Sequence, residues 1–576
     1  MINRWTWFVI CIVFGLLLMT CGWLMPVHLR AVEAPLLKQA GQSTPSLTSR
    51  GTDLLRAGQL GAAEMLLRAA ENPKATEHET KRDVETFADA VDGTAKQFPV
   101  DEAWGVADPT LNNYFPAAPV PGETLSDFVV HEENRNKALE FLEKSQQPAV
   151  RELLQTRSLT KLSTFAPSQE AGGEAFDAAL VVVGVLLDQQ ALAPGLRNDI
   201  SAVALQANRG GNTVPLEQML LDFLSLGQRL NWGQLSVFVG KTESIAVLDE
   251  QVDAVRSAGG ELPVLFAATE LSGEPKTVAG HVRNFREDGL KDIATALSFG
   301  AGGVQALVHQ NQRIYSTHWR ALASEYDPFA AVQSLMADYC WHMPTFALIM
   351  KWVMYFGAGF LLALALHFGR PPASNLEEPL QVRGFHIARE ILFASGFLLV
   401  VLLVSEPFLA HEGTGAAMPF RLHIPMAGSA VQPGSTDIKA SIMNQSNPII
   451  ILLFFVLQGL LYIACVVKLA EIRRQRVGPR VKLKLLENEE HLFDAGLYLG
   501  FLGTIVSFIV YSVMAGKGGH QFSLMVAYSS TSFGILFVSF FKIFHLRPTK
   551  RRLLLEAEAE TGVVSAPATA HAYPTS

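Results

Sequence analysis

Residues 344–368 read PTFALIMKWVMYFGAGFLLALALHF, an apolar run in which Lys351 is the one charged residue. A bilayer core requires about 20 consecutive apolar residues per helix, so this run is long enough to cross a membrane. Five other runs meet the same requirement, and the six are Trp5–Met25, Pro344–Phe368, Ile387–Ala410, Pro448–Leu469, Leu492–Met514 and Phe522–His545. The sequence therefore predicts an all-α, polytopic membrane protein with six transmembrane helices.

The first apolar run has two interpretations. The apolar region of a signal peptide is about 7–15 residues long, which is shorter than Trp5–Met25. The nearest small-residue cleavage pattern, Val32-Glu33-Ala34, is followed by Pro35, which disfavours cleavage. We therefore expect residues 1–29 to be an uncleaved N-terminal transmembrane anchor, with a signal peptide as the alternative.

Charge divides the chain into two parts. The 576 residues carry a net charge of −8, and 17% of them are charged, below the roughly 25% of soluble domains. Residues 30–343 contain 26 Lys and Arg against 40 Asp and Glu, so the rest of the chain is basic. This composition excludes a disordered chain, a disulfide miniprotein and a nucleic-acid-binding protein with a basic face.

The acidic segment has the periodicity of helices. Two helices are expected over Gly51–Asn72 and Glu77–Phe98. Further helices are expected near 132–156, 174–192, 196–209, 215–230, 232–258, 262–272, 276–288, 290–299 and 301–325. Strands at Leu235–Val239 and Leu262–Ala267 are the alternative, but neither stretch alternates with a strict period of two. The segment between the first and second spans is thus predicted to be a large extracytoplasmic domain of stacked antiparallel helices.

Orientation follows from the positive-inside rule, which compares Lys and Arg in the short loops. With the N-terminus inside, the inner segments contain 16 such residues and the short outer loops contain 3. Both termini are therefore expected in the cytoplasm, and residues 30–343 are expected outside the inner (plasma) membrane. The predicted divisions are 1–29 (anchor), 30–343 (external domain), 344–490 (three spans and a basic loop), 491–546 (a hairpin of two spans) and 547–576 (a cytoplasmic tail).

Catalytic motifs are absent from the sequence. Gly240-Lys241-Thr242 lacks the preceding glycine that a phosphate-binding loop needs, and no His-Glu-x-x-His, cysteine pair or serine elbow is present. Among the ionisable side chains within the spans we single out Lys351, Glu406 and Lys542, which lie near span ends. We therefore expect that the protein is not an enzyme and that it has no cofactor, catalytic residue or metal site.

The last two spans concentrate small and hydroxyl residues. The fifth contains Gly500-Phe501-Leu502-Gly503-Thr504-Ile505, and the sixth contains Ser530-Thr531-Ser532-Phe533-Gly534-Ile535. Such residues let helices approach closely, and they can also line a polar path. The two stretches resemble the G-x-L-G-T-V and T-T-A-x-G-L stretches of the MotA/TolQ/ExbB proton-channel family, over about residues 491–546. The chain departs from that family at Val538-Ser539, where the family usually has a proline.

The resemblance implies a channel-like subunit of a machine driven by an ion-motive force. Its candidate ion-path or helix-packing residues are Gly500, Gly503, Thr504, Ser530, Thr531 and Gly534. Implied partners are the lipid bilayer, other copies of the chain, a single-span protein with a transmembrane carboxylate, and envelope proteins bound through residues 30–343. The alternative is a non-conducting membrane scaffold that presents a helical protein-binding domain outside the membrane.

The charge count makes a testable prediction about topology. A cysteine introduced by Gly122→Cys lies outside, and one introduced by Gly478→Cys lies inside. An impermeant thiol reagent applied to intact cells should therefore label the first variant and spare the second. Labelling of the Gly478→Cys variant in intact cells would contradict the six-span arrangement.

Overall fold

The computed structural model describes residues 4–120, 123–316, 327–369, 385–406, 448–515 and 524–564. The chain separates into two compact units. The first, here called the apolar unit, contains the described residues up to Arg30 and those from Met343 onward. The second, here called the acidic unit, contains the described residues of Ala31–His342.

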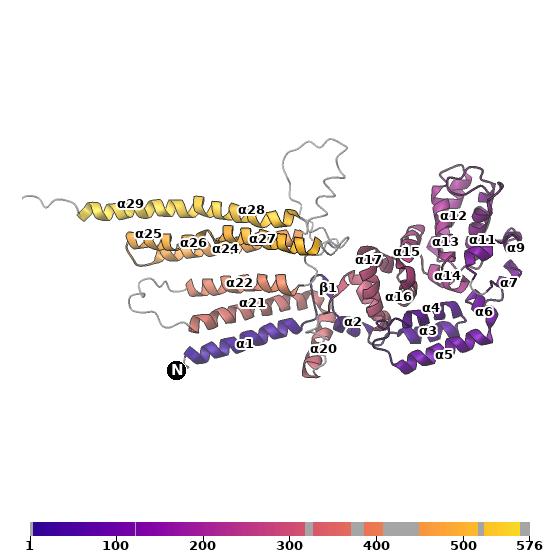
Figure 1. Cartoon of the computed structure of the whole chain (residues 1–576), viewed down its shortest axis with the longest axis horizontal. Coiled ribbons are helices and arrows are strands. Elements are labelled where there is room, and N and C mark those ends of the chain that lie inside the picture. Colours follow the sequence, from indigo (N-terminus) through magenta and orange to yellow (C-terminus); the bar gives the residue numbers. More distant parts are fainter. Residues whose placement is uncertain are drawn as a thin grey trace, which may run out of the picture. The chain divides into compact units, whose positions relative to one another are not determined.

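The acidic unit is a sequence of short helices that pack against their neighbours (Figure 1). Its α-helices up to residue 188 are α2 (Ala34–Gly41), α3 (Leu47–Arg56), α4 (Leu60–Ala70), α5 (Lys81–Gln97), α6 (Pro99–Trp104), α7 (Leu111–Tyr114), α8 (Leu125–Val130), α9 (Glu132–Leu142), α10 (Pro148–Gln155) and α11 (Glu174–Asp188). They are followed by α12 (Pro194–Asn208), α13 (Val214–Gly227), α14 (Trp232–Val239), α15 (Ile245–Ala258), α16 (Leu262–Ser272), α17 (Pro275–Leu297), α18 (Gly300–Gln310) and α20 (Asp327–His342). Two 3₁₀ turns, Thr156–Ser158 and Gly259–Glu261, and the paired strands β1 (Ala31–Val32) and β2 (Arg313–Ile314) complete its described elements.

Local sequence signals set the starts of many of these helices. The side chain of Ser46 accepts a hydrogen bond from the Ser49 amide at the start of α3, and Thr80 does the same for Asp83 at the start of α5. Asn231 and Gln234 form a complete capping box at the start of α14. Proline occupies the first turn of α6, α10, α12, α16 and α17, where its missing N–H costs no hydrogen bond.

The helical class predicted for this segment is confirmed over the described residues, but several boundaries differ. The helix expected over Gly51–Asn72 is two helices, α3 and α4, because the chain turns at Gly58 with a φ of +77°. The helix expected over 132–156 is interrupted before Pro148, and the one over 232–258 is interrupted before the N-cap Ser244. Both stretches considered as strands are helical, in α14 and α16.

Two further boundaries differ near the end of the acidic unit. Helices were expected to separate at Gly289, but the kink within α17 lies at Arg286, which has a φ of +51°. The helix expected over 301–325 ends as α18 at Gln310, where Asn311 takes a left-handed conformation. Residues 317–326 lie outside the described residues.

The core of the acidic unit is built around α11, whose residues Ala178–Leu187 are all buried. A helix that is apolar all round has to be covered on every side, and α8, α9, α10 and α13 pack against it. A second contact joins the start of the unit to its end. A Cβ added to Gly302 of α18 would lie 2.1 Å from the carbonyl oxygen of Ala40 in α2, so only glycine permits this approach.

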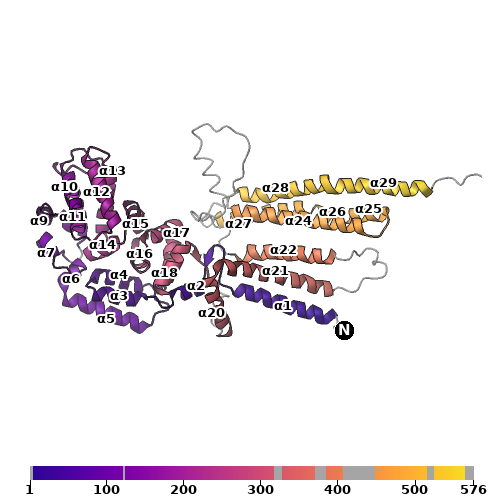
Figure 2. The same cartoon turned by 180° about the vertical axis from the view of Figure 1, so that it is seen from behind.

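The apolar unit consists of long helices that run side by side (Figure 1 and Figure 2). They are α1 (Arg4–Leu24), α21 (Pro344–Gly369), α22 (Phe385–Ser405), α24 (Pro448–Arg474), α27 (Ala495–Ala515) and α28 (Leu524–Phe541). Helix α21 packs against α1 and α22, and α28 packs against α27 and α24. Helices α25 (Pro479–Asn488) and α26 (Glu490–Phe493) join α24 to α27. A π-helical turn, η4 (Lys542–Leu546), connects α28 to α29 (Arg547–Val564).

Four helices of the described chain are long and apolar enough to cross a membrane. They are Arg4–Leu24, Pro344–Gly369, Phe454–Arg474 and Tyr528–Glu560, of which the last continues through η4 into α29. The predicted span Ile387–Ala410 begins in α22, and residues 407–447 lie outside the described residues. The predicted span Leu492–Met514 coincides with α27, of which Ala495–Ile505 is counted as a shorter apolar helix. The count of six spans therefore remains a prediction, as does the external position of the acidic unit.

Two glycines of the acidic unit provide a matched test of its packing. A Cβ added to Gly302 meets the Ala40 carbonyl, whereas a Cβ added to Gly93, within α5, meets nothing within 4 Å. Gly302→Ala should lower the free energy of unfolding by about 1–3 kcal/mol through overpacking. Gly93→Ala should raise it by about 0.5–1 kcal/mol, because alanine loses less backbone entropy in a helix.

The measurement is thermal and urea unfolding of residues 31–342, monitored by the far-ultraviolet circular dichroism signal of the helices. Equal effects of the two substitutions would contradict the close contact between α2 and α18. A spectrum dominated by strand or coil would contradict the helical acidic unit itself.

Candidate functional site

The six residues singled out in the last two predicted spans meet where α27 packs against α28. The hydroxyl oxygens of Thr504 and Thr531 lie 2.5 Å apart. One hydroxyl donates to the other, and the second hydroxyl donates to the carbonyl oxygen of Gly500, which lies 3.1 Å from the Thr504 oxygen within its own helix and 3.2 Å from the Thr531 oxygen across the contact. We call this contact the α27–α28 seam. Its hydroxyl groups thus form a small network shared by the two helices.

Glycine makes the seam possible. A Cβ added to Gly500 would lie 2.9 Å from the Ser530 carbonyl oxygen, and one added to Gly503 would lie 2.5 Å from the Ser530 hydroxyl. On the other helix, a Cβ added to Gly534 would lie 2.6 Å from the Gly496 carbonyl oxygen. Any larger residue at these positions would push the helices apart and lengthen the hydroxyl contacts, which is the behaviour of small residues at membrane helix contacts.

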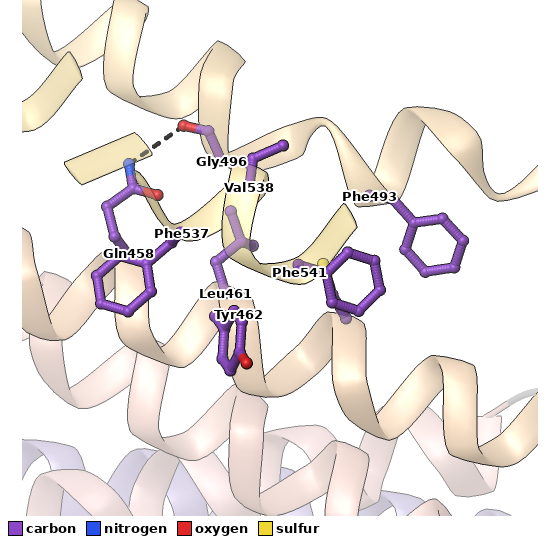
Figure 3. Close-up of a pocket in the computed structure, with 9 residues that line it drawn as sticks. Gln458, Leu461, Tyr462, Phe493, Gly496, Phe537, Val538 and Phe541 are labelled. Atoms are coloured by element: carbon purple, nitrogen blue, oxygen red, sulfur yellow. Dashed lines mark hydrogen bonds between the residues drawn. The ribbon is translucent and has the colours of Figure 1, made fainter. Parts of the chain in front are cut away.

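A third helix, α24, brings an amide to the same place. Gln458 is 1% exposed, and its Nε2 donates to the Gly496 carbonyl oxygen over 3.2 Å, as the dashed line in Figure 3 shows. Its Oε1 has no hydrogen-bond partner among the described residues. Gln458 lines a cavity of about 10 Å³ between α24, α27 and α28, together with Tyr462, Cys465 and Phe541. That volume is at the lower limit for a single water molecule.

Polar groups also gather where these helices end at the basic side of the unit. The Tyr462 hydroxyl and His545 Nε2 lie 2.8 Å apart, which joins α24 to η4. Lys542, in the same turn, pairs with Asp494 at 2.6 Å. A π-helical turn holds one residue more than an α-helical turn, and such turns are frequent at functional sites. Lys542 was expected simply to lie near the membrane surface, and the structure gives it a specific carboxylate partner.

A separate cluster ties α1, α21 and α22 together. Lys351 Nζ donates to the Val27 carbonyl oxygen over 2.6 Å, and it lies 3.3 Å from His28 Nδ1 and 3.6 Å from Glu406 Oε1. The Leu29 amide donates to Glu406 Oε2 over 2.9 Å. Lys351 is fully buried among these groups, although its position near a span end would also allow it to reach the surface. A buried ammonium needs such partners, because an isolated charge in an apolar interior is costly.

The contacts between these residues carried no signal in the sequence. His28 lies just outside the first apolar run, and Lys351 and Glu406 are 55 positions apart, so no spacing rule connects the three. Gln458 and Tyr462 are one helical turn apart in α24, on one face of that helix, which is the one local pattern that could have marked them.

The acidic unit buries two carboxylates in different ways. Burial raises the pKa of Asp222 to about 6, with Asp249 adding to the effect and Arg256, at 3.2 Å, opposing it. Burial also acts on Glu217, but hydrogen bonds from the amides of Ser163, Thr164 and Phe165 outweigh it and hold the pKa of Glu217 below its usual range. Within the described ranges, no group of three or more His, Cys, Asp or Glu side chains is placed to hold a metal ion.

Comparison with known proteins returned no match. No family model matches the chain, and neither the curated proteins nor the solved structures contain a match to it.

The buried carboxylate of Asp222 predicts a pH dependence of stability. Its pKa is about 6 in the folded state and about 3.9 in an unfolded chain, so the folded state binds the proton more readily. The stabilisation by this proton is complete below pH 4 and is lost as the pH rises through 6. The wild type should therefore gain about 1 kcal/mol relative to Asp222→Asn when the pH falls from 7 to 5.

Urea unfolding of residues 31–342 at the two pH values measures this difference. The exposed Asp92 supplies the control, because Asp92→Asn should change stability by the same amount at both pH values. A wild type that loses stability relative to Asp222→Asn on acidification would contradict the assignment.

Proposed function

We propose that the protein is a channel-like membrane subunit of an envelope machine driven by an ion-motive force, and that α27 and α28 form its ion-handling pair. The observation that carries the proposal is the convergence of Thr504, Thr531 and Gly500 on one contact. Hydroxyl groups and backbone carbonyl oxygens are the ligands through which an apolar helix pair can interact with a proton or a small cation.

The rest of the proposal follows from charge and position. The basic segments near α25 and α29 are assigned to the cytoplasm, and the acidic unit to the outside of the plasma membrane. The residues of the seam include no carboxylate, so a carboxylate that binds the transported ion has to come from another segment or protein. We assign that role to a single-span partner protein packed against α27 and α28 in an assembly with other copies of the chain. Envelope proteins are assigned as ligands of the acidic unit.

A second candidate function is a non-conducting scaffold. It is favoured by the mutual bonding of the Thr504 and Thr531 hydroxyls, which satisfies both groups within the helix pair. Buried threonines commonly bond to a carbonyl oxygen one turn back, as Thr504 does with Gly500. In this role the seam only fixes the helices, and the acidic unit carries the function by binding other proteins.

Removal of the two hydroxyls separates these candidates. The double variant Thr504→Val/Thr531→Val nearly preserves the shape of both side chains. If the seam handles ions, proton flux through membrane vesicles should fall about tenfold or more, equivalent to at least about 1.4 kcal/mol, at unchanged abundance. The flux is measured with a pH-sensitive dye, and the flux through vesicles from cells that lack the protein is subtracted.

The matched control is Ser532→Ala. Ser532 lies on α28 next to Thr531, but it is exposed and its hydroxyl donates to the Tyr528 carbonyl oxygen of its own helix. This variant should keep full flux. Full flux in the double variant would reject the ion-handling role and leave the scaffold as the explanation.

A further inference from the structure

The polar groups of the α27–α28 seam continue toward the basic end of the apolar unit. Gly496 lies one helical turn before Gly500 on α27, and its carbonyl oxygen accepts the Gln458 amide. Gln458 and Tyr462 occupy successive turns of α24 and line one cavity. Tyr462 then bonds to His545. The row from Thr531 to His545 covers 14 residues of α28 and η4, or about 21 Å at 1.5 Å per residue.

Three observations single out the end of this series of polar groups that lies at Gln458, Tyr462 and His545. The Oε1 of Gln458 is buried and without a hydrogen-bond partner among the described residues, and it lies at a cavity with room for about one water molecule. Tyr462 lines the same cavity and bonds to an imidazole, the side chain that most readily exchanges protons near neutral pH. The imidazole belongs to a π-helical turn, and Figure 3 shows Gln458 and Tyr462 extending from the same helix beside α28.

We propose that Tyr462 and His545 form a proton-exchange site through which protons pass between the α27–α28 seam and the cytoplasm. This inference rests on the proposed function of the seam. Its ligand is the proton itself, and the proposal places one water molecule in the cavity that Gln458 and Tyr462 line, as the link between the pair and the seam.

The transfer balances without any further reactant. His545 begins with its proton on Nε2, donated to the Tyr462 oxygen. A cytoplasmic proton binds at Nδ1, the Nε2 proton moves to Tyr462, and the hydroxyl proton of Tyr462 leaves for the water in the cavity. One proton enters and one leaves, so the pair keeps its number of protons and His545 ends with its proton on Nδ1. The same steps in reverse move a proton to the cytoplasm.

The surroundings of His545 are compatible with this exchange. His545 is half-buried, so it is not enclosed by the helices of the unit. The titratable and charged groups around it are Tyr462 and Cys465 on α24, Asp494 and Lys542, which pair with each other, and Arg547 after the turn. The carboxylate of Asp494 is thus already occupied by Lys542, and Tyr462 is the group that reaches His545 Nε2.

Proton flux in inside-out membrane vesicles tests the inference, because the cytoplasmic face is then open to the medium. The vesicles come from cells that make the full chain with its partners. His545→Ala and Tyr462→Phe should each lower the flux about tenfold or more, since each removes a group that transfers the proton. Imidazole added to the medium should restore flux to His545→Ala, because it can carry the proton in place of the missing ring, and should leave Tyr462→Phe unrestored.

The matched controls are His491→Ala and Tyr498→Phe. Both residues are exposed, His491 in α26 and Tyr498 in α27, and both variants should keep flux within about twofold of the wild type. His545→Gln retains a hydrogen-bonding group for Tyr462 but cannot exchange a proton. It should therefore accumulate normally and still lose flux, which separates proton exchange from a purely structural role.

The outcomes distinguish this site from the proposed function. If the Thr504→Val/Thr531→Val variant loses flux while His545→Gln and Tyr462→Phe keep normal flux, the proposed proton-exchange site is rejected. The proposed role of the seam then stands. Loss of flux in His545→Ala that imidazole does not restore would assign His545 a structural role and overturn the inference. Wild-type vesicles with no flux above the deletion strain would overturn both proposals.

Discussion

The close approach of α27 and α28 is the constraint on which the candidate site depends. Gly500, Gly503 and Gly534 leave no room for a Cβ, so the helices approach until backbone carbonyl oxygens and hydroxyls of the two helices meet. Only at that distance can Thr531 reach the Gly500 carbonyl oxygen, and only then do the Thr504 and Thr531 hydroxyls bond. The same glycine spacing places Gly496 where the Gln458 amide of α24 can donate to it. A single packing requirement thus assembles polar groups from three helices.

Polar groups elsewhere in the apolar unit follow the same physical rule. Polar groups buried between apolar helices have no water to bond to, so they have to be satisfied by neighbouring helices. Lys351 meets Val27, His28 and Glu406 in this way, and the cluster fastens α1 to α21 and α22. Lys542 and Asp494 make a second such contact at the basic end of the unit. In both places a charged side chain joins helices whose surfaces are otherwise mostly apolar.

The acidic unit follows the physics of a water-soluble protein. Several of its helices start at side-chain caps or prolines, α16 ends at Gly273 and α18 ends at Asn311, and α11 supplies the apolar centre. Its boundaries were misplaced mainly where the apolar periodicity continued across a break. The helix at Gly51–Asn72 is an example, because the apolar residues of α3 and α4 face a common core although Gly58 turns the chain between them.

The sequence by itself determined the helical class, the long apolar helices and the residue types of the seam, since these depend on length, periodicity and local composition. It also marked Gly500, Thr504, Thr531 and Gly534 as a group, because each stretch is short and local. The partners of those residues were decided by tertiary structure alone. Gln458 reaches Gly496, Tyr462 reaches His545 and Lys351 reaches Glu406 only because helices distant in the chain pack together. Contacts of this kind depend on how helices are rotated and spaced, and no local pattern encodes that.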